Sequence, residues 1–182
     1  MAKRRFKTDL TVSGINNLKA ELINYKNNIL QSKLNLFTRR LAEIGLNVAN
    51  VKISESPLGK YVSVKIETKS LNGESIAFLI ANGQTVQSEG YEPFNILLGI
   101  EFGSGIHYNK DEINPYANEL GFGYGTFPGQ LHALKDEGWY YWDAKTETWK
   151  HSYGIKATMP MYNAYIQMLQ QIQTIAREVF GK

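Results

Sequence analysis

Residues 15–44 read INNLKAELINYKNNILQSKLNLFTRRLAEI, and this stretch decides the fold. Its apolar residues recur mostly every three or four positions, which places them on one face of an α-helix. They are Leu18, Leu22, Tyr25, Leu30, Leu34, Phe37 and Leu41. We expect the helix to begin at Ser13 or Gly14 and to end at Gly45. At about 1.5 Å per residue it would be ~45 Å long, which is more than one small core needs, so part of its apolar face is available to a partner subunit.

After this helix the apolar pattern changes to the alternation that is typical of β-strands. Val62, Val64 and Ile66 alternate with polar residues, and Ile76, Phe78 and Ile80 alternate in the same way. Asn72-Gly73 lies between the two runs and favours a tight hairpin turn. We expect residues 51–53 to add another strand, which gives a three-stranded meander.

The second half of the chain contains fewer periodic segments. Residues 84–129 are rich in glycine and include one apolar run, residues 94–100, which predicts a short helix or strand. Residues 138–152 have the pattern of an aromatic hairpin. Thr158-Met159-Pro160 then opens a final helix that closes at Gly181. The predicted fold is α+β, with a basic N-terminal arm over residues 1–14 and a single domain over residues 15–182.

Composition limits the classes of protein to which the chain can belong. It has 182 residues, of which 43% are hydrophobic and 20% are charged, so we expect one folded domain with its own core. It contains no cysteine, which excludes disulfides and thiolate metal sites. No apolar stretch approaches the ~20 residues of a membrane span, and we expect a cytoplasmic protein without a membrane partner.

Positive charge is concentrated at the N-terminus. Residues 1–40 hold nine Lys and Arg against two Asp and Glu, a surplus of seven, whereas the whole chain has a net charge of +3. The basic run consists of Lys3, Arg4, Arg5 and Lys7. It is a candidate contact for DNA or for an acidic partner surface, and the alternative is a solvated face.

The sequence gives little sign of catalysis or of a bound cofactor. The three histidines, His107, His132 and His151, are far apart and have no recognised metal-ligand spacing, so we expect no metal. The glycines of residues 121–125 do not end in Gly-Lys-Ser/Thr, as a phosphate-binding loop would. Ser104 is not in a Gly-x-Ser-x-Gly elbow, because the residue two before it is Phe102.

One enzymatic alternative remains open. Asp136, Glu137 and Asp143 lie near the aromatic residues of the predicted hairpin, and paired carboxylates beside aromatic rings are typical of carbohydrate- or peptidoglycan-active modules. The aromatic residues concerned are Trp139, Tyr141 and Trp149. Packing in a core or at a subunit interface is the competing interpretation of these rings.

Two segments carry a resemblance to a known family. Residues 98–105 read LGIEFGSG, which resembles the EFGTG signature of phage tail-completion proteins of the minor tail protein Z-like group, with Ser104 where threonine is usual. Residues 157–164, ATMPMYNA, resemble the entry to the final helix of that family. The order of elements is also similar, with a long helix, a short sheet, the signature, a glycine-rich loop, an aromatic hairpin and a last helix.

This resemblance implies a non-enzymatic virion protein of the phage neck or tail, assembled in the host cytoplasm. Its expected partners are copies of itself in a ring, other neck and tail proteins, and DNA held non-specifically in the channel. The candidate subunit-interface residues are Phe102, Trp139, Tyr141, Trp149 and Met161. Residues 105–138 depart from the family pattern by being longer and more aromatic.

Within the signature, Glu101 is interpreted as a structural residue. We expect it to accept backbone hydrogen bonds at the turn that Gly103 and Gly105 permit.

Overall fold

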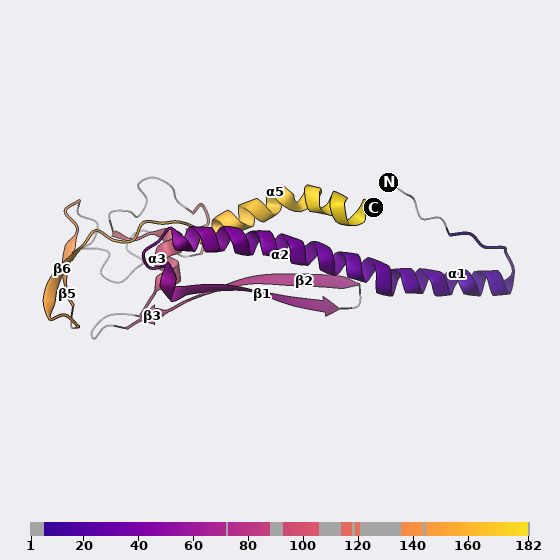
Figure 1. Cartoon of the computed structure of the whole chain (residues 1–182), viewed down its shortest axis with the longest axis horizontal. Coiled ribbons are helices and arrows are strands. Elements are labelled where there is room, and N and C mark those ends of the chain that lie inside the picture. Colours follow the sequence, from indigo (N-terminus) through magenta and orange to yellow (C-terminus); the bar gives the residue numbers. More distant parts are fainter. Residues whose placement is uncertain are drawn as a thin grey trace.

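The computed structural model describes residues 6–71, 73–87, 93–105, 114–117, 119–120, 136–143 and 145–181, with the side chains of Trp139 and Tyr141 left aside. The fold is α+β, as the sequence predicts, and the molecule is elongated (Figure 1). A central helix lies between a C-terminal helix on one side and a β-hairpin on the other, so the core has three layers.

The central helix is longer than predicted. It consists of α1 (Val12–Asn24), the π-helical segment η1 (Tyr25–Leu30) and α2 (Gln31–Ser54), which follow one another without a break. Thr11 begins it, because its side chain accepts a hydrogen bond from the Gly14 amide at 3.0 Å. The predicted end at Gly45 and the predicted strand at residues 51–53 are both wrong, since α2 continues through both. The predicted boundary at residue 14 falls inside α1.

Gly45 does not end the helix because it serves close packing instead. The C-terminal helix α5 (Pro160–Phe180) runs antiparallel to α2, with Phe37 beside Phe180 and Gly45 beside Met168. A Cβ atom at residue 45 would lie 2.7 Å from the Met168 sulfur. The glycine therefore lets the two helices approach, and tertiary packing outweighs its low helix propensity.

The β-hairpin covers the other side of α2. It consists of β1 (Val62–Leu71) and β2 (Glu74–Gly83), paired so that Ile66 is opposite Leu79, and Gly73 in the turn has a φ of 85°. The short helix η2 (Gly59–Tyr61) leads into it. The hairpin around Asn72-Gly73 is thus confirmed, while the three-stranded meander is wrong, because this sheet has two strands.

The register decides which residues of β2 face the core. Val64 and Ile66 of β1 are the less exposed set, and their direct partners are Ala81 and Leu79. Partners that are directly opposite share one face of the sheet. The larger apolar residues of β2, Ile76, Phe78 and Ile80, lie on the other face of the sheet. Ile76 and Phe78 are exposed there, and Ile80 is half-buried.

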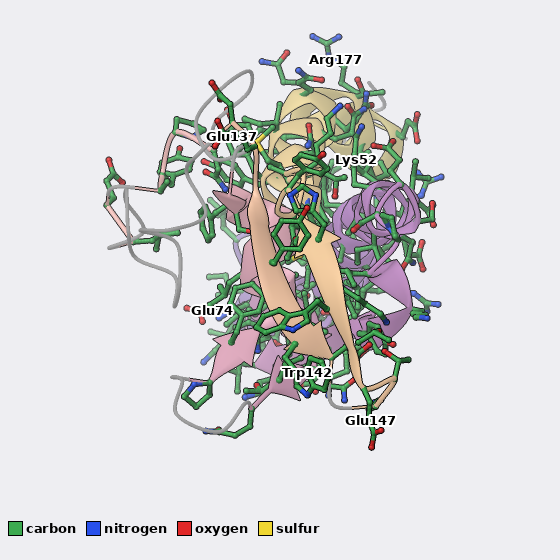
Figure 2. All side chains as sticks on the ribbon, turned by 90° about the vertical axis from the view of Figure 1, so that its left-hand side faces the viewer. Lys52, Glu74, Glu137, Trp142, Glu147 and Arg177 are labelled. Atoms are coloured by element: carbon green, nitrogen blue, oxygen red, sulfur yellow. The ribbon has the colours of Figure 1, made fainter. Side chains whose placement is uncertain are left out.

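Three further elements complete the described chain. β3 (Thr85–Val86) pairs with β4 (Phe94–Asn95), which leads into α3 (Ile96–Phe102). β5 (Trp139–Asp143) and β6 (Thr148–Ser152) form the predicted aromatic hairpin. In Figure 2 this hairpin crosses the front of the molecule, at the end opposite α1. No helix in the described ranges is long and apolar enough to cross a membrane.

Candidate assembly surfaces

Glu101 links the signature segment to the C-terminal helix. It lies at the end of α3 and is buried, and its carboxylate accepts hydrogen bonds from the backbone amides of Met161 at 2.9 Å and Tyr162 at 3.0 Å. Asn114 donates a third hydrogen bond at 2.8 Å. The carboxylate thus supplies the N-terminal cap of α5, where the Met159 side chain makes none, and a negative charge there also suits the helix dipole.

Burial and hydrogen bonding act on Glu101 in opposite directions. Burial raises the pKa of its carboxyl group, and the hydrogen bonds from Met161, Tyr162 and Asn114 lower it without cancelling the effect of burial. Glu101 is therefore a structural carboxylate whose hydrogen bonds go to the start of α5. The sequence predicts that Glu101 accepts hydrogen bonds from backbone amides at the adjacent glycine turn. Two of the donors are backbone amides, as predicted, but they belong to the start of α5.

The glycines of the signature make the turn that follows Glu101. Gly103 and Gly105 have φ values of 75° and 65°, a region that favours glycine. Between them, Ser104 exchanges backbone hydrogen bonds with Ile155, at 2.9 and 3.2 Å. The turn therefore places the signature beside the segment that precedes α5.

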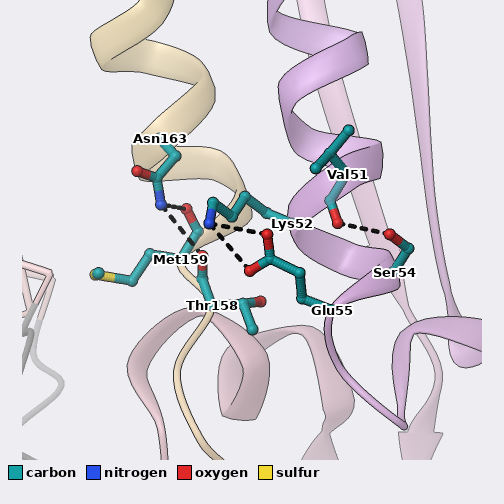
Figure 3. A network of polar contacts seen from close by, with 7 residues as sticks. All are labelled: Val51, Lys52, Ser54, Glu55, Thr158, Met159 and Asn163. Carbon is teal, nitrogen blue, oxygen red and sulfur yellow. Dashed lines mark hydrogen bonds and ion pairs between the residues drawn. The ribbon is translucent and has the colours of Figure 1, made fainter.

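The entry to α5 is held by a second set of polar contacts. Met159 adopts a left-handed conformation, with φ of 48° and ψ of 55°. The Asn163 side chain donates to the carbonyl oxygens of Thr158 and Met159, and at the end of α2 Lys52 forms an ion pair with Glu55 (Figure 3). The amides of Thr158 and Met159 donate to the Ile100 carbonyl oxygen. The signature and the start of α5 are therefore fixed to one another.

The predicted interface residues whose side chains the structure describes differ in exposure. Phe102 is buried at 6% exposure and packs with Ala117, Phe94 and Leu98, so its assignment to the surface is wrong. Phe102 lies on the same apolar face of α3 as Leu98, and this face packs into the core. Met161 is half-buried beside Glu101, whereas Trp149 is 67% exposed. The side chains of Trp139 and Tyr141 are outside the described part of the chain.

The exposed aromatic residues of the hairpin lie on one face of it. Trp142 and Trp149 are cross-strand partners with ring centres 5.7 Å apart, and Tyr140 and His151 are partners at 4.5 Å. Tyr153 continues the row at 4.5 Å from His151. We call these residues the aromatic ladder: Tyr140, Trp142, Trp149, His151 and Tyr153. Of these residues, the sequence analysis named only Trp149 as a candidate interface residue. Tyr140, Trp142 and Tyr153 could have been predicted, because alternate residues of a strand lie on the same face.

Among the carboxylates near the aromatic ladder, Asp143 is paired with a lysine. Asp143 is bound to Lys150 across the hairpin, and this hydrogen bond, together with one from the Lys145 backbone amide, lowers the pKa of Asp143 to about 2. Such a group stays ionised and cannot serve as a general acid. Glu137 is exposed, and no cluster of three metal-ligating side chains occurs among the described residues.

The remaining predicted residues are only partly described. Lys7 is exposed, while Lys3, Arg4 and Arg5 lie outside the described residues. His107 and His132 also lie outside them, and His151 belongs to the aromatic ladder. Nothing in the described part of the N-terminus brings Lys7 to the signature segment or to the hairpin.

The N-terminal part of the long helix extends beyond the core. Gln31 marks the boundary, because its side chain binds the tip of the β-hairpin at Ser70, Gly73 and Glu74. We call the preceding segment, Val12–Leu30, the helical extension. It contains no buried residue, and α1 packs substantially against no described helix or strand except η1 (Figure 1).

Exposed apolar side chains follow one face of this extension. Ile15 is 51% and Leu22 45% exposed, and Leu18 lies between them. Phe6 folds back and places its ring edge-on against Tyr25, with 5.8 Å between ring centres. We call Ile15, Leu18 and Leu22 the extension stripe. The sequence predicts the period of this stripe, and the structure shows that it extends beyond the core.

No protein-family model, no curated protein and no solved structure matches this chain.

Proposed function

We propose that this chain is a non-enzymatic structural protein of a phage neck or tail, which assembles with copies of itself into a ring around the DNA channel. The observation that carries the proposal is the helical extension, whose apolar stripe includes the exposed Ile15 and Leu22 and lies beyond the core of its own chain. A helix of this length gains most of its stability from tertiary packing of its apolar face. A partner subunit would supply that packing.

The signature segment supports the same proposal. Residues 98–105 carry the resemblance to tail-completion proteins, and in this structure they connect the core to α5 through Glu101. This connection fixes α3 relative to α5. A subunit that contacts one neighbour through each of two surfaces requires such a fixed arrangement. The other neck and tail proteins are expected to contact the exposed ends of the ring, including the aromatic ladder.

Light scattering with negative-stain imaging tests the proposal on the full chain. Over a range of protein concentrations and salt, we expect the mass to rise from that of a 20.6 kDa monomer to a discrete larger species that appears as closed rings. A mass that stays at the monomer value over this range would contradict self-assembly. Open, unlimited polymers would contradict the ring.

The basic N-terminus is proposed to contact DNA in the channel without reading its sequence. Phosphate contacts made by Lys and Arg weaken steeply as salt increases, because condensed counterions are released on binding. We expect removal of residues 1–7 to reduce both DNA retention and its salt dependence. If DNA retention is unchanged by this removal, the basic run contacts a protein partner or is solvated instead.

A second candidate function rests on the aromatic ladder. Exposed Trp142 and Trp149 offer flat faces that stack on sugar rings as well as on protein. A carbohydrate- or peptidoglycan-binding module would retain cell-wall fragments as a monomer and lose them in Trp149→Ala. The ring protein would keep its assembly state in the presence of such fragments and would not retain them.

A further inference from the structure

The extension stripe is continuous with the apolar seam of the core. The seam residues of α2, Leu34, Phe37 and Leu41, follow one another at intervals of three and four, and the wider π-helical turn of η1 compensates for the step of five between Tyr25 and Leu30. Within the core this seam is covered by α5, which reaches Phe37 through Phe180. Beyond that level α5 has ended, so α5 does not cover the same helix face on the extension.

A second exposed stripe lies on α5 itself. Tyr165, Leu169 and Ile172 are 41%, 46% and 38% exposed, and they share a helix face distinct from the one that buries Ala164 and Ile175. We call these three residues the α5 stripe. Tyr116 lies edge-on against Tyr165, with 6.3 Å between ring centres, and extends the apolar surface.

The α5 stripe lies on a helix that lacks charge. No Asp, Glu, Lys or Arg occurs between Pro160 and Ala176, although much of this helix is exposed. Depletion of charged residues is a compositional mark of interface cores, whereas solvated helix faces usually carry charges. The outer face of the β-hairpin differs, because Lys65 pairs there with Glu67 at 2.6 Å and Lys69 lies over the Phe78 ring.

The two stripes match in spacing when the helices are antiparallel. Ile15, Leu18 and Leu22 follow at steps of three and four, and Ile172, Leu169 and Tyr165 follow at the same steps when α5 is read backwards. α2 and α5 already pack antiparallel within one chain, with Arg40 bound to Glu178 at 2.7 Å. The extension, with 13 residues in α1 and 6 in η1, is also similar in length to α5, with 21.

We propose that the extension stripe of one copy packs antiparallel on the α5 stripe of a second copy of this chain. The contact uses two different surfaces, so each copy offers its extension to one neighbour and its α5 to another. Such heterologous contacts generate rings when the rotation closes and filaments when it does not. This inference rests on the proposed self-assembly and names its contact, but it does not depend on a role in a virion.

Two single substitutions and their mixture test the contact in the full chain. Leu22→Glu places a charge on the extension stripe, and Leu169→Glu places one on the α5 stripe. Both side chains are nearly half exposed, so each variant should keep the circular dichroism spectrum of the parent. Asn17→Glu and Gln170→Glu are matched controls, because they add the same charge to exposed positions on other faces of the same helices.

Sedimentation velocity over a concentration series gives the result. We expect each stripe variant alone to sediment as a monomer at concentrations at least tenfold above those at which the parent assembles. An equimolar mixture of the two variants should form a one-to-one dimer and nothing larger, since one intact extension and one intact α5 remain. Both control variants should assemble as the parent does.

Other outcomes would overturn the inference in distinguishable ways. If Leu169→Glu assembles normally while Leu22→Glu does not, the extension binds elsewhere, for example to another extension. If both variants assemble like the parent, the contact is wrong although the self-assembly under "Proposed function" stands. If the parent forms open filaments that both variants abolish, the contact stands and the ring is wrong. A parent that remains monomeric would overturn both.

Discussion

Glu101 is the residue through which the signature segment acts on the rest of the fold. Its carboxylate satisfies two amide groups at the first turn of α5, which would otherwise lack an intrahelical partner, and it binds the buried Asn114 side chain. Asn114 in turn accepts a hydrogen bond from the Tyr116 amide at 3.0 Å. A single acidic side chain therefore connects α3, the segment around residue 114 and α5.

We predict that Glu101→Gln destabilises the fold. A glutamine side chain has one acceptor oxygen, so one of the three donors that face the carboxylate would meet an NH₂ group instead. The expected loss is about 1–3 kcal/mol in the free energy of unfolding, measured by denaturant titration. Glu21→Gln, at an exposed position of α1, should change this free energy little and serves as the control.

The same variant should also change the dependence of stability on pH. Because the folded-state pKa of Glu101 is raised above its ordinary value of 4.5, the folded chain holds this proton more tightly than the unfolded chain. Its contribution to stability is present below 4.5 and is lost as pH rises through the folded-state pKa. The stability advantage of the parent over Glu101→Gln should therefore shrink as pH rises through this window, and a constant advantage would contradict the assignment.

Asp143 shows the opposite shift at the exposed end of the molecule. Its pKa is lowered to about 2 by Lys150, so whatever it contributes to the hairpin is present above its ordinary pKa of 3.8 and is lost as pH falls through about 2. We predict a carboxyl titration midpoint near pH 2 by NMR, moving back towards 3.8 in Lys150→Met. A midpoint that does not respond to this substitution would show that Lys150 is not the cause.

At the scale of elements, the π-helical segment explains an irregularity in the sequence. The residues of the predicted apolar stripe, from Leu18 to Leu41, step by three or four, except between Tyr25 and Leu30, where the step is five. In a regular α-helix a step of five would turn the stripe away from its face. The wider π-helical turn of η1 absorbs the extra residue and keeps the extension stripe in line with the seam of α2.

We therefore predict that deletion of Asn27 is tolerated. It shortens the step from Tyr25 to Leu30 to four, which a regular α-helix accommodates on the same face. The thermal unfolding midpoint should be equal to or higher than that of the parent. Insertion of one alanine after Asn27 is the comparison, because a step of six places the extension stripe on another face and should reduce self-assembly. Equal self-assembly of the two variants would contradict the alignment.

On the scale of the whole molecule, stability is distributed unevenly. α2 is covered by α5 on one side and by the β-hairpin on the other, whereas the helical extension contains no buried residue. Segments with few buried apolar contacts open at low free-energy cost. The part of the chain proposed to bind a neighbour is thus the part that the isolated subunit holds least firmly.

Amide hydrogen exchange should report this difference. In dilute solution we expect amides of residues 12–24 to exchange faster than those of residues 37–53. At concentrations where the protein assembles, protection should rise in residues 12–24 and remain almost unchanged in residues 37–53. Equal protection of both segments in dilute solution would show that the extension is stable without a partner.

The sequence by itself determined the α+β class, the two helices, the hairpin at Asn72-Gly73 and the aromatic hairpin. These features follow from periodicity and turn chemistry, which act between residues close in the chain. Only the tertiary structure decided that Gly45 lies inside a helix, that Phe102 is buried and that Glu101 caps α5. Each of these depends on a partner distant in sequence, such as Met168 for Gly45 and Met161 for Glu101. Local patterns do not encode that pairing, because it arises from the way α2, α3 and α5 fill one shared core.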